Sequence, residues 1–130
     1  MLRRHATLLV CGALSIMDGD HLMGYDRVGW RCAVVRGPSM SPTLADGDVV
    51  LISLRARPRP GAVVLVRWPQ RPGQLSVKRA VGRHGAGWWV EGDNPPASTD
   101  SRQLGPATPI AVVLARLWPA PRIQRAQRGR

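Results

Sequence analysis

Residues 49–81 are VVLISLRARPRPGAVVLVRWPQRPGQLSVKRAV, and this stretch decides the predicted fold. It contains three short apolar runs, at 49–54, 62–68 and 75–81, separated by residues that favour turns. The first two runs are rich in Val and Leu. In the third run, successive side chains would point to opposite faces of a strand. Short runs of this composition are typical of β-strands. We therefore predict a mainly β fold.

The rest of the chain continues this pattern in both directions. We predict further strands at 32–35, 88–91 and 110–118, an extended connector at 55–60, turns at 69–73 and 82–87, and a long loop at 92–109. A chain of 130 residues has room for one domain. We place this domain at 28–118, between an apolar N-terminal segment, 1–27, and a basic solvated tail, 119–130.

The N-terminal segment is open to three interpretations. Basic residues at 3–5 precede an apolar run at 6–17, as in the head of a secretory signal. The run falls short of the roughly 20 residues that span a bilayer, and no small-x-small cleavage site follows it. A weak membrane anchor, a short buried helix and an upstream extension of the domain all fit.

The charge of the chain is strongly positive, with a formal net charge of +11. The basic residues are scattered and no aromatic residues interleave with them, so we expect no nucleic-acid partner. An anionic partner or a membrane surface fits better. Lys78 is the only lysine among the 19 Lys and Arg residues. It is therefore the one basic side chain that burial can turn into a neutral amine.

Metal and cofactor chemistry find no support in the sequence. Cys11 and Cys32 do not form a CxxC pair, and the three histidines have no ligand spacing. Isolated thiols are a better interpretation of the cysteines than a disulfide. We expect neither a metal nor another cofactor.

Ser39 lies in a segment that could present a nucleophile. Pro38 and Pro42 make the backbone around it rigid and irregular, so a fixed turn would hold its hydroxyl. An ordinary turn serine fits the same pattern. Further along, Asp100 and Arg102 lie in the long loop, where they could form an ion pair that stabilises the loop.

Lys78 lies in a predicted strand and shares one face with Ser76 and Ala80. Small neighbours on that face give it a poor route to water. Desolvation disfavours the ammonium and lowers the pKa of a lysine, which would let Lys78 take a proton from a serine hydroxyl. An edge-strand lysine that opposes aggregation is the alternative.

Four separated motifs together resemble the ordered motifs of the type I signal peptidases. They are Gly-x-Ser-Met-x-Pro-Thr-Leu at 37–44, Lys-Arg at 78–79, Gly-Asp-Asn at 92–94 and Ser-x-Asp-Ser-Arg at 98–102. The resemblance covers about 34–118 and implies a coiled β-sheet catalytic core, related to that of the repressor proteases. It implies a serine endopeptidase that removes N-terminal leader peptides from precursor proteins.

The resemblance also implies residue roles. Ser39 would be the nucleophile, with its backbone N–H in the oxyanion hole, and Lys78 the general base. Ser98 would orient the lysine, and Asp100 and Arg102 would form a structural pair. Position 37 is Gly, where some members have a serine that completes the oxyanion hole, so that second donor must come from elsewhere or be absent.

Within the family, the segments at 87–94 and 97–102 resemble the nickel-type superoxide dismutase maturation proteases. The expected partner is then the precursor of that dismutase, and the expected location is cytoplasmic or membrane-associated. The alternatives are a general signal peptidase for secretory precursors and, from another class, a non-catalytic basic binding module. The SOS-response repressor proteases would carry a DNA-binding segment, and no helix-turn-helix pattern precedes the domain.

Overall fold

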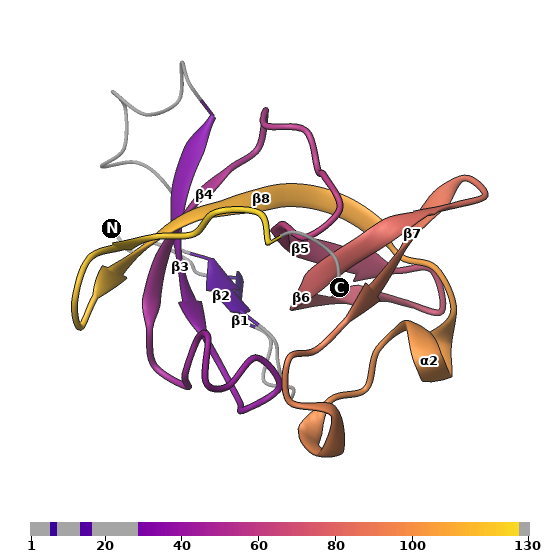
Figure 1. The fold of residues 1–130 in the computed structure, drawn as a ribbon, viewed down its shortest axis with the longest axis horizontal. Helices are drawn as coiled ribbons and strands as arrows, with labels where there is room; N and C mark the ends of the chain where they lie inside the picture. Colours follow the sequence, from indigo (N-terminus) through magenta and orange to yellow (C-terminus); the bar gives the residue numbers. More distant parts are fainter. Residues whose placement is uncertain (1–5, 8–13, 17–28, 128–130) are drawn as a thin grey trace.

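The computed structural model describes residues 6–7, 14–16 and 29–127, and its strands form one curled antiparallel sheet (Figure 1). The strands are β1 (Ala6–Thr7), β2 (Leu14–Ile16), β3 (Trp30–Val35), β4 (Val49–Ser53), β5 (Val63–Trp68), β6 (Arg71–His84), β7 (Gly87–Glu91), β8 (Thr108–Trp118) and β9 (Arg122–Ile123). Their order in the sheet is β1-β2-β3-β4-β8-β5-β6-β7, and β9 pairs with β8. The predicted mainly β fold is confirmed.

β8 joins the two halves of the sheet. It pairs with β4 along one edge and with β5 along the other, and Figure 1 shows it arching over the molecule from one half to the other. The sheet curls so far that β2 contacts β6, although these strands are not neighbours in the sheet order. The curl brings the loop after β3 towards the strands β6 and β7.

The sheet buries apolar side chains on both of its faces, and β5 contributes to both. Val63 and Leu65 pack in one cluster, the first core, whereas Val64, Val66 and Trp68 pack in the second core. A strand buried on both sides needs an apolar run without strict alternation. This explains why residues 62–68 carry such a strong strand signal in the sequence.

β6 is longer than predicted at both ends. We predicted turns at 69–73 and 82–87, but β6 runs from Arg71 to His84, and the turns shrink to residues 69–70 and 85–86. The predicted turns contain Pro and Gly, which favour turns locally. Pairing with Trp68 at one end and with β7 at the other keeps these residues extended.

The long loop predicted at 92–109 contains two short helices. A 3₁₀ turn covers Pro95–Ala97, the helix α2 covers Ser101–Leu104, and β8 begins at Thr108. Asp100 is the N-cap of α2 and accepts a hydrogen bond from the backbone N–H of Arg102. This capping arrangement fixes the region of the loop that carries the predicted site residues.

Both terminal segments take part in the sheet where the structure describes them. In the N-terminal apolar run, Ala6–Thr7 and Leu14–Ile16 are strands, and β2 pairs with β3; the remaining residues of 1–27 lie outside the described part of the chain. The segment predicted as a solvated tail is largely exposed, yet Arg122–Ile123 pairs with β8. The domain boundaries at Val28 and Trp118 stay predictions.

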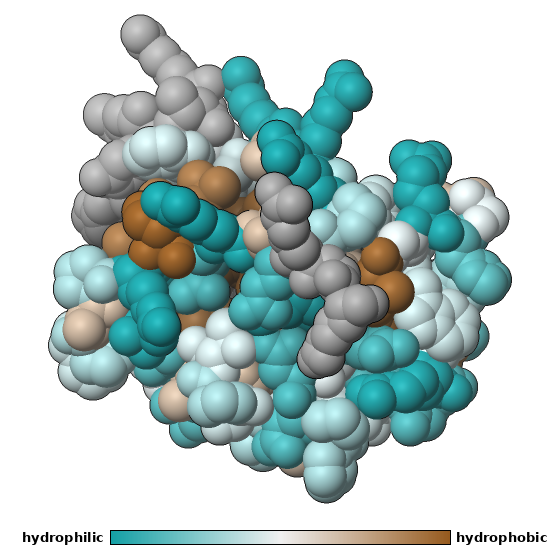
Figure 2. Space-filling model, viewed as in Figure 1, coloured by the Kyte–Doolittle hydropathy of each residue, from teal (hydrophilic) through white to brown (hydrophobic). Residues whose placement is uncertain are grey.

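Five large apolar side chains are exposed in the described part of the chain: Leu54, Val81, Leu117, Trp118 and Ile123. On the face shown in Figure 2, small apolar areas lie among hydrophilic side chains. None of the helices within residues 29–127 has the length and hydrophobicity to cross a membrane.

Candidate active site

Ser39 lies in the irregular loop between β3 and β4. Its neighbours Met40 and Leu44 are fully buried in the first core, which anchors the loop. The backbone N–H of Gly37 donates a 2.7 Å hydrogen bond to Oδ1 of Asp46, across the base of the loop. The loop is therefore held from inside the core and from within its own backbone.

The hydroxyl of Ser39 is buried and has no hydrogen-bond partner among the described residues. Buried hydroxyls in folded proteins nearly always have a partner, and exceptions occur at catalytic positions. No hydrogen bond within the described part of the chain engages the backbone N–H of Ser39 either. Both groups that a nucleophilic serine uses are thus uncommitted to other described residues.

Lys78 lies on β6 opposite Val64 of β5, and its side chain is fully buried. Its Nζ atom donates a 3.0 Å hydrogen bond to Oγ of Ser98. Cross-strand neighbours share a face of the sheet, so Lys78 lies on the side of the second core, to which Val64 belongs. Lys78 was predicted to share this face with Ser76. Ser76 is buried and accepts a 3.0 Å hydrogen bond from Nε1 of Trp68, a residue of the second core, which agrees with this placement.

Ser98, Asp100 and Arg102 continue the hydrogen-bond network that begins at Lys78. The Ser98 hydroxyl donates to Oδ2 of Asp100 at 2.6 Å. Arg102 donates from Nε to Oδ1 at 2.9 Å and from Nη2 to Oδ2 at 2.6 Å, which is a bidentate ion pair. The backbone N–H of Gly92 donates to the same carboxylate at 2.8 Å.

Asp100 stays ionised in this environment although it is fully buried. Burial by itself raises the pKa of a carboxyl group, but hydrogen bonds from Arg102, from Ser98 and from the backbone outweigh it and lower the pKa of Asp100 to about 2. The hydrogen bond between the Arg102 and Asp100 side chains also raises the pKa of Arg102. The buried negative charge is therefore balanced by Arg102.

The ionised carboxylate fixes the direction of the network. A carboxylate can only accept, so the Ser98 proton is committed to Asp100. The lone pairs of Ser98 Oγ are then available to accept the proton of Lys78. This hydrogen bond gives the amine of Lys78 one defined direction, towards Ser98 Oγ.

Gly92 is the point where the Ser39 loop meets the Lys78 network. A Cβ atom at Gly92 would contact Ser98 Oγ and would come within 2.7 Å of the backbone oxygen of Ser39. Asn94 completes the junction, since its backbone N–H donates to Ser39 O at 2.9 Å and its side chain donates to Pro38 O at 3.0 Å. The segment 92–94 therefore holds the backbone of Ser39 beside Ser98.

A second polar cluster supports this junction and was not predicted from the sequence. Arg79 Nη2 donates to Oδ2 of Asp93 at 2.6 Å, and Thr43 Oγ1 donates to the same oxygen at 2.5 Å. The cluster ties β6 and the Ser39 loop to the segment after β7. The signal was available, because an Asp and an Asn that follow a Gly directly after a strand are well placed to bind neighbouring loops.

The structure places five of the six predicted site residues in one region. Ser39, Lys78, Ser98, Asp100 and Arg102 gather around Gly92. The sixth, Gly37, has its backbone N–H bonded to Asp46 and is not free to act as an oxyanion donor. The roles of these residues stay predictions, whereas their common location is observed.

The described residues contain no cluster of three His, Cys, Asp or Glu side chains that could hold a metal ion. Cys32 is a free, half-buried thiol on β3, and burial raises its pKa. Cys11, the other cysteine of the predicted pair of isolated thiols, lies outside the described residues.

Comparison with known proteins gives the class to which the fold and the site belong. Residues 26–87 match the family described as signal peptidase, peptidase S26. The chain is 37% identical over 116 residues to the mitochondrial ATP-independent inner membrane protease subunit 1a of Arabidopsis thaliana, with 65% of this chain and 68% of the relative covered. It is 30% identical over 114 residues to the mitochondrial inner membrane protease subunit 1 of Xenopus tropicalis, with 66% and 68% covered. No solved structure shows a significant match.

The chain belongs to the signal peptidase family S26, and its family activity is that of a peptidase. The family resemblance inferred from the four motifs is confirmed at this level.

Proposed function

We propose that this protein is a serine endopeptidase that removes N-terminal leader peptides, with Ser39 as nucleophile and Lys78 as general base. One observation carries the proposal. The only lysine of the chain is fully buried and hydrogen-bonded to Ser98, and Ser98 lies beside the backbone of a buried serine whose hydroxyl has no described partner.

The chemistry needs Lys78 to be a neutral amine. Burial disfavours the ammonium form, and Arg102 balances the charge of Asp100, so that carboxylate does little to stabilise an ammonium at Lys78. Ser98 accepts one N–H of the amine and thereby positions its lone pair. A neutral, oriented amine can serve as a base without a histidine.

In the proposed reaction, Ser39 Oγ attacks the carbonyl carbon of the scissile bond while its proton moves to Lys78 Nζ. The oxyanion that forms is stabilised by the backbone N–H of Ser39. Lys78 then gives the proton to the leaving amine, the C–N bond breaks and an acyl ester remains on Ser39. Water then attacks the ester while its proton moves to Lys78 Nζ, and Lys78 passes this proton to Ser39 Oγ as the acid leaves, which restores the free hydroxyl and the neutral amine.

Two substitutions test this mechanism. Ser39→Ala removes the nucleophile, and Lys78→Arg keeps a positive charge but cannot supply a neutral base. Both should abolish cleavage of a leader-bearing precursor while circular dichroism stays that of the wild type. The matched control is Arg67→Lys, which changes an exposed basic residue of β5. Substantial cleavage by purified Lys78→Arg protein would overturn the mechanism.

The substrate that we propose is the precursor of a nickel-type superoxide dismutase. The support is the resemblance of residues 87–94 and 97–102 to the proteases that mature this enzyme. Nickel would belong to the processed substrate, so the protease needs no nickel site. The alternative is a general signal peptidase that removes leader peptides from secretory precursors; the relatives named above are inner membrane proteases.

A digestion experiment separates the two substrates. Purified protein is incubated with the dismutase precursor and with a secretory precursor, and the new N-termini are sequenced. Clean cleavage of the dismutase precursor alone supports the specific proposal. Cleavage of the secretory precursor, with the dismutase precursor intact, would overturn it and leave the roles of Ser39 and Lys78 in place.

A further inference from the structure

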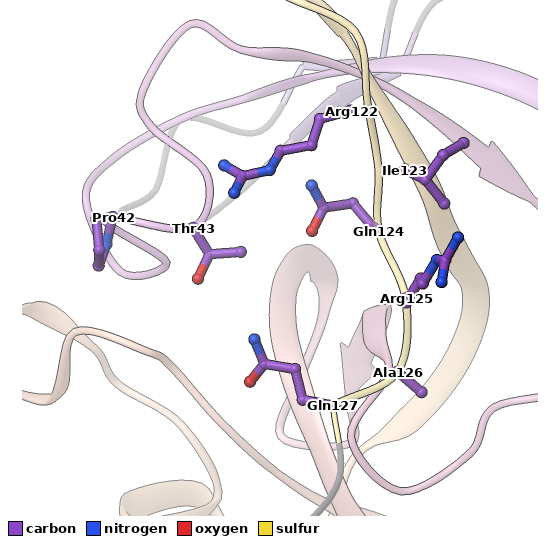
Figure 3. Close-up of a pocket in the computed structure, with 8 residues that line it drawn as sticks. All are labelled: Pro42, Thr43, Arg122, Ile123, Gln124, Arg125, Ala126 and Gln127. Atoms are coloured by element: carbon purple, nitrogen blue, oxygen red, sulfur yellow. The ribbon is translucent and has the colours of Figure 1, made fainter.

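A polar groove runs beside the Ser39 loop and is lined on its far side by residues 122–127. The segment Arg122–Gln127, here called the strap, crosses the sheet opposite Pro42 and Thr43, and the hollow between them has a volume of about 490 Å³. Figure 3 shows Arg122, Gln124 and Gln127 directed into this hollow, with Thr43 facing them from the loop.

The strap is fixed at both of its ends. At one end Arg122 and Ile123 pair with β8, and the Gln124 N–H donates to Leu114 O at 2.8 Å. At the other end the Gln127 N–H donates to Gly61 O at 2.9 Å. The two backbones approach so closely that a Cβ atom at Gly61 would collide with Gln127 O. Backbone hydrogen bonds at both ends therefore hold the strap in place as one side of the groove.

The groove carries positive charge that the described protein does not neutralise. No described carboxylate forms an ion pair with Arg122, and no acidic residue lines the hollow. The side chain of Arg125 points to the other side of the strap (Figure 3). The side chains of Gln124 and Gln127 add both donors and acceptors, which can bind the N–H and C=O groups of an extended peptide. An arginine beside such groups is suited to a carboxylate.

The groove leads towards the candidate active site. A neighbouring hollow of about 400 Å³ shares Pro42, Thr43 and Gln127 with it and extends to Gly92, the residue that contacts Ser98 and the Ser39 backbone. This second hollow is lined by Glu91 and Asp93 as well as by Arg79 and Arg102. The carboxylates of the second hollow would repel a long polyanion such as a nucleic acid that filled both hollows. Arg122 in the first hollow is therefore suited to a single acidic side chain of a peptide.

We propose that this groove binds the substrate polypeptide near its scissile bond and selects an acidic residue at Arg122. The proposal rests on the proposed peptidase function and adds a specificity site to it. Pro42 lies three residues after Ser39, so their Cα atoms are at most about 11 Å apart. An extended peptide advances about 3.3 Å per residue. Pro42 is thus within about three or four residues' length of the bond that is cut, and Arg122 lines the same hollow as Pro42, so we test the acidic residue at the third and fourth positions from that bond.

The test uses fluorescence-quenched peptides of ten residues that differ at one position. Asp or Asn is placed at the third or fourth residue on either side of a central Ala-Ala bond. At one of these positions the wild type should cleave the Asp peptide faster than the Asn peptide, with a ratio of kcat/KM of about fivefold, as for a partly exposed ion pair. Arg122→Gln should abolish the ratio and Arg122→Glu should reverse it.

The matched control is Arg67→Gln, since Arg67 is exposed on β5 and does not line the groove. The control should keep the full ratio. Equal cleavage of every Asp and Asn pair by the wild type, or an unchanged ratio in Arg122→Gln, would overturn the proposal.

A binding measurement separates this proposal from the proposed function. The anisotropy of labelled Asp and Asn peptides is followed with full-length Ser39→Ala protein, which cannot cleave. Tighter binding of the Asp peptide that is lost with Arg122→Gln supports the groove even if the wild type cleaves neither peptide, an outcome that would overturn only the proposed function. Equal binding of both peptides would overturn the groove alone.

Discussion

Lys78 and Ser98, twenty residues apart in the chain, are joined by a 3.0 Å hydrogen bond from Nζ to Oγ. This bond links the strand β6 to the loop before α2. Since the Ser98 proton is committed to the Asp100 carboxylate, the bond has one direction, from the amine to the hydroxyl oxygen. The orientation of Lys78 thus depends on a chain of groups that ends at Arg102.

The first prediction concerns Ser98. Ser98→Ala removes the acceptor that orients Lys78, so kcat should fall by about 10²-fold, at the low end of what a positioned base contributes, with little change in KM. The control is Ser76→Ala, which removes another buried hydroxyl, on the same face of β6 as Lys78. It should lower the free energy of unfolding by about 1 kcal/mol. A loss of stability without a loss of kcat in Ser98→Ala would contradict the orienting role.

The second prediction concerns the junction at Gly92. Gly92→Ala places a methyl group against Ser98 Oγ and the Ser39 backbone. We expect a loss of about 1–3 kcal/mol in the free energy of unfolding, as for other overpacked sites, and a larger relative loss of activity. Gly73→Ala is the matched control, because a Cβ atom at Gly73 would have no neighbour within 4 Å among the described residues. Activity at the wild-type level in Gly92→Ala would show that the junction does not position the site.

The third prediction follows from the lowered pKa of Asp100, about 2 in the folded protein. A lowered carboxyl pKa adds stability that is complete above the unfolded value near pH 4 and is lost as the pH falls towards 2. Asp100→Asn should therefore be less stable at pH 7 by about 2 kcal/mol. Urea unfolding should show this difference shrinking between pH 4 and pH 2. A difference that stays constant over that range would contradict the ion pair.

The fourth prediction concerns the pH dependence of cleavage. If a buried lysine is the base, kcat/KM should rise with pH at a midpoint well below about 10.4, the pKa of a solvated lysine. His84 lies at the end of β6 with its ring 5.2 Å from that of Trp89. His84→Ala should leave the profile unchanged. Loss of the profile in this variant would transfer the role of base from Lys78 to His84.

Local sequence signals predict the buried strands well. Residues 62–68 form an apolar run because β5 is buried on both faces. The same signals fail where tertiary pairing decides, as in β6, where Gly82 stays extended because it pairs with β7. Likewise, two residues at 122–123 become a strand only because β8 offers them an edge.

The site was predicted by a different route. Taken alone, Ser39 fits an ordinary turn and Lys78 an ordinary edge strand, so residue chemistry leaves both open. The order of four motifs grouped them by resemblance to a family, and the curl of the sheet places them in one region. Gly92 and Asn94 belong to the third motif but were given no role, because the close approach of Gly92 to Ser98 and the hydrogen bonds of Asn94 to the Ser39 loop depend on tertiary structure that no periodic pattern reveals.

The long strand β8 limits where residues can be inserted in the chain. It pairs with β4, which follows the Ser39 loop, and with β5, the partner of the strand that carries Lys78. The pairing of β8 with both neighbours already contains register shifts, which can absorb an extra residue as a bulge. A residue inserted in β8 without such a bulge would turn the following side chains to the opposite face. Insertions at the exposed hairpin turn of Gly85 and Ala86 would leave this alignment intact. The molecule therefore accommodates added residues more readily at that hairpin than within β8.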